Sequence, residues 1–488
     1  MADLIRIHPR DNVAVALRPI APGTETPWGP SAEIPQGHKI ALESIGPGEP
    51  VIKYGFPIGY ATESIAPGQW VHTHNVKTAL SEGGDYTYTP TQYCQPPARE
   101  LSFQGYLRPD GRAATRNEIW IIPTVGCVNS TAQALAAQYR DLCEGSLEGI
   151  YAFPHPYGCS QMGDDHARTR KLLAALCCHP NAGGVLVLGL GCENNTVDAF
   201  QQELGEYDPV RVRFLVCQQV EDELAAGRRL LEELAAYCRV FRRQSLPLDK
   251  LVVGMKCGGS DGLSGITANP TVGAFSDQLI ACGGSSILTE VPEMFGAEQL
   301  LLNRCRDLRT FEAAVAMIND FKHYFTAHGQ VVYENPSPGN KAGGITTLED
   351  KSLGCVQKGG TAPVNDVLDY GDSIRTPGLN LLYGPGNDLV STTALTAAGA
   401  QLILFTTGRG TPFGAPVPTI KISTNDRLSA GKAGWIDFSA GPVADGEPVP
   451  EAAERLLQYV IAVASGEQTA AERRGYREIA IFKDGVTM

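Results

Sequence analysis

Long apolar runs, an excess of basic residues and an apolar leader are all missing from this sequence of 488 residues. No uncharged run approaches the roughly 18 apolar residues of a membrane span. The first residues, MADLIRIHPRD, lack the apolar segment of a secretory signal. Lys and Arg total 40 against 53 Asp and Glu, a net charge of −13, which argues against nucleic-acid binding. We therefore expect a cytoplasmic enzyme that needs neither a membrane nor a nucleic acid.

The composition is that of a globular protein, with 43% hydrophobic and 19% charged residues. The length allows two to four domains, at roughly 100–200 residues each. The 13 cysteines are odd in number and spread along a long chain. Such cysteines are typical of reduced thiols or metal ligands rather than of a disulfide framework.

Three structural regions are predicted. Residues 1–80 carry short apolar stretches separated by Ala-Pro-Gly and Gly-Pro-Gly turns, which predicts a small all-β domain. A polar, proline-containing linker over 81–105 precedes two α/β domains, at 106–245 and 246–488. A glycine-rich insertion at 334–360 interrupts the last domain. The fold class is therefore α/β, with a small N-terminal all-β domain.

Strand and helix patterns alternate from residue 116 onward, which predicts mainly parallel sheets with helical crossovers. The expected strands of the second domain are 119–124, 149–153, 184–188 and 212–216, and helices are expected at 131–142 and 165–177. In the last domain, strands are expected at 251–255, 286–289, 379–382 and 401–405, and helices at 268–281, 296–325 and 388–399.

Cysteines follow the predicted strands, where the ligands of open α/β sheets bind. Cys127, Cys159, Cys192 and Cys257 are the candidate metal ligands; the first three each follow a glycine, and Cys217 ends a further strand. The spacings of 32 and 33 residues between the first three match one strand–helix unit each. Thiolates favour iron, zinc or an iron–sulfur centre. The alternative is that each cysteine is a small buried apolar residue.

Histidines and cations supply further candidates. His72 and His74 are two residues apart, so in a strand both imidazoles face one side; the alternative is a surface feature. His166 follows a cysteine loop and is an acid/base candidate or a helix cap. Lys341 and Arg409 lie in glycine-rich loops that match neither a Walker loop nor GxGxxG. We interpret them as clamps for a carboxylate or hydroxyl group, or else as solvated surface charges.

Several long motifs resemble the altronate/galactarate dehydratase family. They include PTVGCVN, HPYGCSQMGDDH, GLGCENN, CGGSDGLSGITANP, YENPSPGNKAGGITTLEDKSLGC and FTTGRGTPFG, and the similarity spans nearly the whole chain. The resemblance implies an N-terminal SAF (β-clip) domain and a hydro-lyase acting on sugar acids. The implied reaction converts D-altronate to 2-keto-3-deoxy-D-gluconate and water in galacturonate catabolism. Galactarate, another sugar acid, or sulfite elimination from sulfolactate are the alternatives within the family. Ferrous iron, with manganese also possible, is the implied activator.

Position and residue type then suggest roles within one shared pocket. His166 is the first candidate base and Lys341 the second, while His72 and His74 are expected as metal ligands or acid/base groups. The expected carboxylate clamps are Arg116, Lys341 and Arg409. The expected hydroxyl-binding residues are Asn129, Glu193, Asn194, Ser260, Asp261 and Asn340. We also expect a homo-oligomer, a dimer. A non-enzymatic sugar-acid sensor and a redox protein with an iron–sulfur cluster remain as alternatives of other classes.

Overall fold

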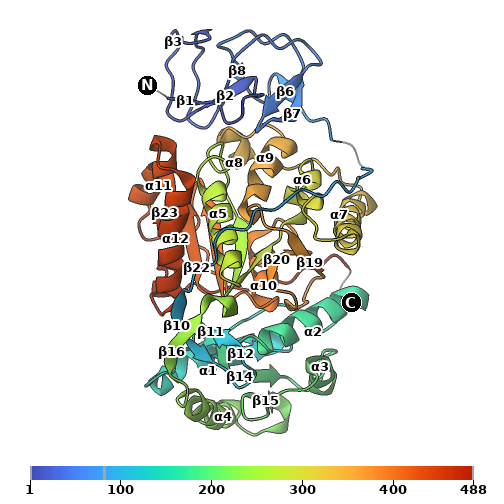
Figure 1. Ribbon diagram of the computed structural model, residues 1–488. Coiled ribbons are helices and arrows are strands. Elements are labelled where there is room, and N and C mark those ends of the chain that lie inside the picture. Colours follow the sequence, from blue (N-terminus) through green and yellow to red (C-terminus); the bar gives the residue numbers. More distant parts are fainter. Residues whose placement is uncertain (1–2, 81–83, 486–488) are drawn as a thin grey trace.

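The computed structural model describes residues 3–80 and 84–485. Three parts follow one another along the molecule: an N-terminal module (residues 3–80) at one end, a second domain (102–247) at the opposite end, and a third domain (248–485) between them (Figure 1). No helix within the described ranges is both long and apolar enough to cross a membrane.

The N-terminal module contains strands and no helix over residues 3–80, so the predicted all-β domain is confirmed. One antiparallel sheet has the order β1-β2-β5-β8 and another the order β6-β7-β9, with β3 and β4 forming a short hairpin. The strands are β1 (Leu4–Ile5), β2 (Val13–Ala16), β3 (Glu25–Thr26), β4 (Gly29–Pro30), β5 (Lys39–Ala41), β6 (Pro50–Lys53), β7 (Phe56–Ala61), β8 (Trp70–Val71) and β9 (Val76–Lys77).

Residues 84–101 form neither helix nor strand, whereas the end of the predicted linker, 102–105, belongs to strand β10 (Ser102–Leu107), and 81–83 lie outside the described residues. Residues 84–101 are nevertheless held against the third domain. The Tyr86 hydroxyl donates to the Glu298 carboxylate at 3.1 Å, and the Tyr88 hydroxyl donates to the Cys305 carbonyl at 2.6 Å. These partly buried bonds attach the segment to the third domain, so it is not a freely moving linker.

The second domain has a four-stranded parallel sheet in the order β13-β12-β14-β15. Its strands are β12 (Glu118–Pro123), β13 (Gly149–Ala152), β14 (Ala182–Gly189) and β15 (Val212–Val216). Its helices are α1 (Asn129–Gln138), α2 (Gly163–Cys177), α3 (Val197–Leu204) and α4 (Glu223–Cys238). A small antiparallel sheet that the sequence did not predict, β11-β10-β16, joins it to the third domain: β10 (Ser102–Leu107), β11 (Ala113–Ala114) and β16 (Arg243–Pro247).

The third domain has a seven-stranded parallel sheet in the order β19-β20-β18-β17-β21-β22-β23. Its strands are β17 (Val252–Cys257), β18 (Ser285–Leu288), β19 (Val364–Leu368), β20 (Gly378–Leu382), β21 (Leu402–Thr407), β22 (Thr419–Ser423) and β23 (Phe438–Ser439). Its helices are α5 (Ala268–Ala281), α6 (Glu298–Leu302), α7 (Leu308–Ala327), α8 (Pro338–Ala342), α9 (Leu348–Cys355), α10 (Asp388–Ala397), α11 (Asp426–Gly431), α12 (Val449–Ala464) and α13 (Ala470–Arg473). The predicted α/β class with mainly parallel sheets is therefore confirmed.

Two local expectations need correction. The single helix expected at 296–325 is two helices, α6 and α7, because Asp307 caps the second one through the Thr310 amide at 2.8 Å. The glycine-rich insertion at 334–360 is not an open loop, since it folds into α8 and α9. Ser337 and Thr347 cap these two helices and explain why so polar a segment is helical. Both helices lie next to the N-terminal module (Figure 1).

Candidate functional site

Four side chains with metal-ligand atoms meet at the carboxyl ends of β17 and β18. Cys257 ends β17, Glu290 and Glu293 follow β18, and Cys355 ends α9. All four are buried, and their ligand atoms lie within 4.8 Å of one another. The Cys257 Sγ lies 3.6 Å from the Cys355 Sγ and 3.0 Å from Glu293 Oε2. We call this group the Cys/Glu cluster.

The spacing of the Cys/Glu cluster is close to that of the ligands of a tetrahedral divalent ion. Metal–sulfur bonds of about 2.3 Å and metal–oxygen bonds of about 2.1 Å separate neighbouring ligand atoms by roughly 3.4–3.8 Å. The Cys257–Cys355 distance of 3.6 Å and the Cys355–Glu293 distance of 3.4 Å match this range, and the Cys257–Glu293 distance of 3.0 Å is shorter than it. Two sulfur and two oxygen donors suit a borderline ion such as iron or zinc. The cluster could therefore hold a metal.

Buried lysines surround the Cys/Glu cluster, and their charges bear on whether a cation fits. The pairs are Lys256 with Glu290 and Asp388, Lys358 with Glu290, and Lys351 with Glu293. While both thiols are protonated, three ammonium groups balance three carboxylates. A divalent ion that replaces the two thiol protons leaves this total unchanged, because each lost proton gives a thiolate. Charge neutrality is therefore kept with or without the ion.

The two glutamates differ in their affinity for a proton. Burial, together with repulsion from Glu293, raises the pKa of Glu290. Burial also acts on Glu293, but the ammonium groups of Lys351, Lys256 and Lys358 together outweigh it and hold the pKa of Glu293 below its usual range. Two carboxylates with opposite shifts are the arrangement from which proton donors and acceptors are built. Glu290 also has a left-handed backbone, φ +72°, which non-glycine residues rarely adopt.

Asp261 lies in the walls of two cavities. One small cavity reaches the cluster and is lined by Lys53, Ser260, Asp261, Lys351 and Cys355, among others. The second is a cavity of about 360 Å³ with Asp261 and three cations, Arg409, Arg427 and Lys432, in its wall. Burial raises the pKa of the Asp261 carboxyl group, although it accepts hydrogen bonds from Ser264 and Thr424.

The N-terminal module is held against the third domain by ion pairs to one buried carboxylate. Asp350, on α9, accepts from Lys39 Nζ at 2.8 Å and from Lys53 Nζ at 3.0 Å, and all three side chains are at most 2% exposed. Two ammonium groups share one carboxylate here. Burial and the neighbouring Lys53 charge lower the pKa of Lys39, the Asp350 carboxylate raises it, and the net pKa is about 8. Backbone contact is also close, because a Cβ on Gly262 would lie 1.8 Å from the Gly37 carbonyl oxygen.

A group of aromatic rings lies at the same junction. His72 is only 8% exposed, stacks on Trp70 and lies 4.8 Å from the His38 ring, measured between centroids. His38 Nε2 is 3.3 Å from the carbonyl oxygen of Ala342 on α8. Burial and the nearby Lys39 lower the pKa of His72 to about 3, so its imidazole is neutral at physiological pH. Its Nδ1 has no hydrogen-bond partner among the described residues.

Comparison with known proteins covers the chain from end to end. Residues 2–79 match the model described as "Altronate/galactarate dehydratase SAF domain", residues 105–239 the second-domain model of the same proteins, and residues 248–487 "D-galactarate/Altronate dehydratase, C-terminal". The chain is 54% identical over 493 residues to the altronate dehydratase of Escherichia coli K12, covering 99% of both chains. The chain belongs to the altronate/galactarate dehydratase family. The altronate dehydratase of Bacillus subtilis 168 is 51% identical over the full length of both chains. The E. coli galactarate dehydratase (L-threo-forming) is 33% identical, over 98% of this chain and 96% of that one.

About half of the residues that the sequence proposed for a family active site lie where the N-terminal module meets the third domain. Asn340 donates to the Ser260 carbonyl at 2.8 Å, and Arg409 donates to the Gly339 carbonyl at 3.0 Å. The residues at this junction are His72, His74, Cys257, Ser260, Asp261, Asn340, Lys341 and Arg409. They come from the N-terminal module, the β17 and β21 loops and α8.

The remaining candidates lie on the second domain, so the single shared pocket is not formed. Its loops carry Cys127, Asn129, Cys159, His166, Cys192, Glu193 and Asn194. The N-terminal module with His72 and His74 is at the opposite end of the molecule (Figure 1). The physical reason is that the chain builds two separate parallel sheets, and each sheet has its own carboxyl edge. Glu193 is also occupied, since it accepts from the Thr124 hydroxyl and from two backbone amides.

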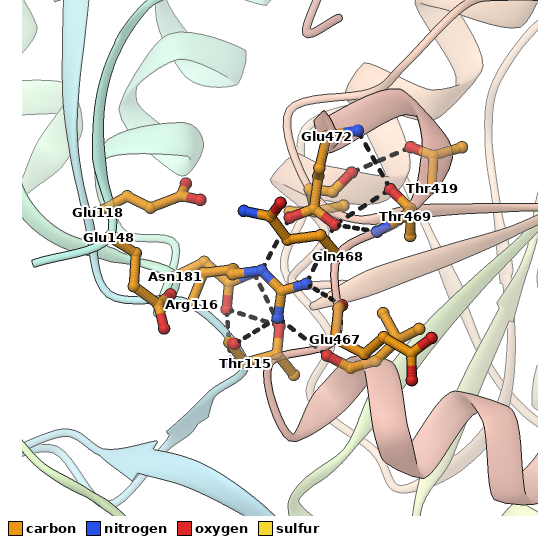
Figure 2. A network of polar contacts seen from close by, with 12 residues as sticks. Thr115, Arg116, Glu118, Glu148, Asn181, Thr419, Glu467, Gln468, Thr469 and Glu472 are labelled. Carbon is orange, nitrogen blue, oxygen red and sulfur yellow. Dashed lines mark hydrogen bonds and ion pairs between the residues drawn. The ribbon is translucent and has the colours of Figure 1, made fainter. Parts of the chain in front are cut away.

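Arg116 is not available to clamp a substrate. All five of its N–H groups donate within the protein, two of them to the Glu472 carboxylate at 2.8 and 3.0 Å. Figure 2 shows the guanidinium enclosed where the second domain meets the C-terminal helices. Arg116 is only 3% exposed. Its role is therefore to join two domains.

Glu290, Glu293, Cys355 and Lys351 of the Cys/Glu cluster and its surroundings escaped the sequence prediction, as did Asn425, Arg427 and Lys432 of the larger cavity. Glu290 and Glu293 stand in TEVPE, directly after a predicted strand, and the rule that ligands bind at strand ends would have included them. Cys355 belongs to the insertion, and only the folding of α9 brings it to Cys257, 98 residues away. No local sequence pattern predicts the contact between Cys355 and Cys257.

Proposed function

We propose that this protein dehydrates D-altronate to 2-keto-3-deoxy-D-gluconate, as a step of galacturonate catabolism. The observation that carries the proposal is full-length identity of 54% and 51% to two altronate dehydratases, against 33% to a galactarate dehydratase. Galactarate or another sugar acid is the second candidate substrate. We further expect a cytoplasmic homodimer.

The 360 Å³ cavity is the proposed binding site for the anionic polyol. A hexonate carries one carboxylate and several hydroxyl groups, so it needs cations at one end and hydrogen-bonding groups along its length. Arg409, Arg427 and Lys432 supply the positive charge, and Asp261 and Asn425 supply polar contacts. A guanidinium holds a carboxylate in two parallel hydrogen bonds, which fixes its orientation.

Elimination of water requires that a proton leaves C2 and that the C3 hydroxyl receives one. The C2 proton is hard to remove because negative charge develops next to the carboxylate, and the cations of the cavity stabilise that charge. His72 lies against α8 through His38 and is a candidate base by position, but its pKa of about 3 makes its imidazole a weak proton acceptor. Asp261 is the proposed acid, because its raised pKa favours the protonated form. The C3 oxygen leaves as water, and the enol that remains becomes the 2-keto acid. His166 is no longer the preferred base, because it lies on the second domain beside Arg170.

The Cys/Glu cluster is the proposed place of the ferrous ion that the family resemblance implies. Cys257, Cys355, Glu290 and Glu293 would hold it, and their sulfur and oxygen donors suit iron better than manganese. When bound, the ion supplies Lewis-acid stabilisation of negative charge. Lys351 pairs with Glu293 and lines the small cavity that links the cluster to Asp261.

Formation of 2-keto-3-deoxy acids from a panel of hexonates and hexarates tests the proposal. The purified protein is assayed anaerobically with ferrous salt, and we expect product from D-altronate well above that from galactarate. Asp261→Asn should abolish turnover, whereas the surface variant Asp110→Asn should not. Preferential turnover of galactarate would assign the second candidate. Tight altronate binding without water loss would instead identify a sugar-acid sensor and refute the enzyme proposal.

A further inference from the structure

Three exposed cysteines lie together on the second domain and have no place in the proposed reaction. Cys127, Cys159 and Cys192 follow β12, β13 and β14, respectively. These strands are neighbours in the sheet, in the order β13-β12-β14. Because the strands are parallel, all three cysteines lie at the same edge of the sheet.

Backbone hydrogen bonds join the three cysteine loops. The Gly126 amide donates to the Tyr157 carbonyl at 2.8 Å, and the Asn195 amide donates to the Gly158 carbonyl at 3.0 Å. The first two loops also touch, since a Cβ on Gly158 would lie 2.0 Å from the Thr124 carbonyl oxygen. Only glycine fits there, and it stands directly before Cys159. The loops therefore hold the three cysteines side by side at one edge of the sheet.

Further hydrogen bonds fix the shape of the loops that carry Cys159 and Cys192. Glu193 accepts from the amides of Leu190 and Gly191, which shapes the turn around Cys192. Ser160, next to Cys159, has a left-handed backbone with φ +57°, and its amide donates to Asn194 at 2.8 Å. A strained non-glycine residue held by such a bond is a feature of preorganised sites.

A fourth cysteine on the next strand does not belong to the set. Cys217 follows β15 but is half-buried against the domain core. Burial raises the pKa of its thiol to about 11, which keeps it protonated. Gln218 beside it donates instead to the Cys192 sulfur at 3.5 Å, a type of contact that stabilises a thiolate ligand.

The spacing of the three sulfurs argues against a single ion. Within residues 3–80 and 84–485, the Cys/Glu cluster is the one group of three or more ligands whose atoms all lie within 4.8 Å. Cys127, Cys159 and Cys192 are therefore too far apart for the edges of roughly 3.7 Å around one tetrahedral ion. An iron–sulfur cluster spans a wider set of thiolates, because each cysteine binds a different iron.

We propose that Cys127, Cys159 and Cys192 bind a [4Fe–4S] cluster through three thiolates, so that one iron has no ligand from the described residues. This is a second metal site, on a different domain from the Cys/Glu cluster. The iron without a cysteine ligand would take an oxygen ligand, such as water or a small hydroxy acid. The site does not depend on the proposed dehydratase reaction.

Anaerobic reconstitution of the full-length protein with ferrous salt, sulfide and a thiol tests the site. Iron, acid-labile sulfide, visible absorbance and the EPR spectrum after reduction are measured. We expect about four sulfides and about four cluster irons per chain, with a brown colour. The triple variant Cys127→Ser/Cys159→Ser/Cys192→Ser should lose all of the sulfide and the EPR signal. Because these residues are exposed, serine is not expected to disturb the fold.

Two matched controls separate this site from the rest of the chain. Cys94→Ser removes another exposed thiol and should keep the full sulfide content. Cys355→Ser removes a ligand of the Cys/Glu cluster and should also keep it. Iron uptake without sulfide, or sulfide retained by the triple variant, would overturn the inference. Neither result bears on altronate dehydration, which is assayed separately.

Discussion

The contact of the N-terminal module with the third domain depends on Asp350. The variant Asp350→Asn tests this dependence directly, because it removes the charge of the shared carboxylate. The carboxylate bonds to Lys39 and Lys53 at 2.8 and 3.0 Å, with all three side chains at most 2% exposed. Removing its charge leaves two buried ammonium groups without a counter-ion, close enough to repel one another. Breaking a buried ion pair in this way costs about 3–5 kcal/mol. We expect a loss of this size, located at the interface between the module and α9.

Urea unfolding measures the total loss, and hydrogen exchange of the β5 amides (Lys39–Ala41) reports whether the module detaches. Glu454→Gln is the matched control, since it breaks the Arg99–Glu454 pair, whose side chains are 42% and 39% exposed. That change should cost at most about 1 kcal/mol. A double-mutant cycle with Lys39→Met should show coupling above about 1 kcal/mol. If Asp350→Asn cost no more than Glu454→Gln, the account of the interface would be refuted.

Three further predictions concern other parts of the molecule. Arg409→Gln should raise KM for the hexonate about tenfold with little change in kcat, because a charged hydrogen bond contributes about 1.5 kcal/mol or more; an unchanged KM would remove Arg409 from the site. Arg116→Gln should lower stability by about 3 kcal/mol and leave KM unchanged, since the residue joins domains; a raised KM would restore its role as a clamp. His179 is fully buried and burial lowers its pKa to about 3, so between pH 6.5 and 3 only the unfolded chain takes up that proton. The free energy of unfolding should therefore fall by about 1.4 kcal/mol per pH unit below 6.5 on account of His179. His179→Gln should remove this part of the slope, measured by urea unfolding at several pH values, and an unaltered slope would contradict the assignment.

The sequence predicted the helices and strands better than it predicted which of them lie in contact. The strands after which Cys127, Cys159, Cys192 and Cys257 stand were found because buried strands read as short apolar runs bounded by glycine. The same pattern could not reveal that Cys257 belongs to a different sheet from the other three. The pattern of apolar residues shows which strands are buried but not which sheet each strand joins. For this reason the sequence predicted one shared pocket, which the structure does not form.

Arg116 and Cys355 show the other limit of the sequence. The sequence around a cation that precedes a strand is the same whether that cation binds a substrate or joins two domains. The same holds for a cysteine in a glycine-rich insertion, which can be a ligand or a structural residue. Their roles follow from partners 356 and 98 residues away, Glu472 and Cys257. By contrast, Ser260, Asp261 and Arg409 stand shortly after strands of the third domain and line cavities, so their predicted role in binding stays a prediction.

Anomalous diffraction at the iron edge, from crystals grown anaerobically with ferrous iron and the product, tests the central claim most directly. The account predicts a peak enclosed by Cys257, Cys355 and the two glutamates, with product density in the cavity that Asp261 and Arg409 line. An iron-dependent enzyme whose crystals show iron only on the second domain, or product bound away from that cavity, would contradict it.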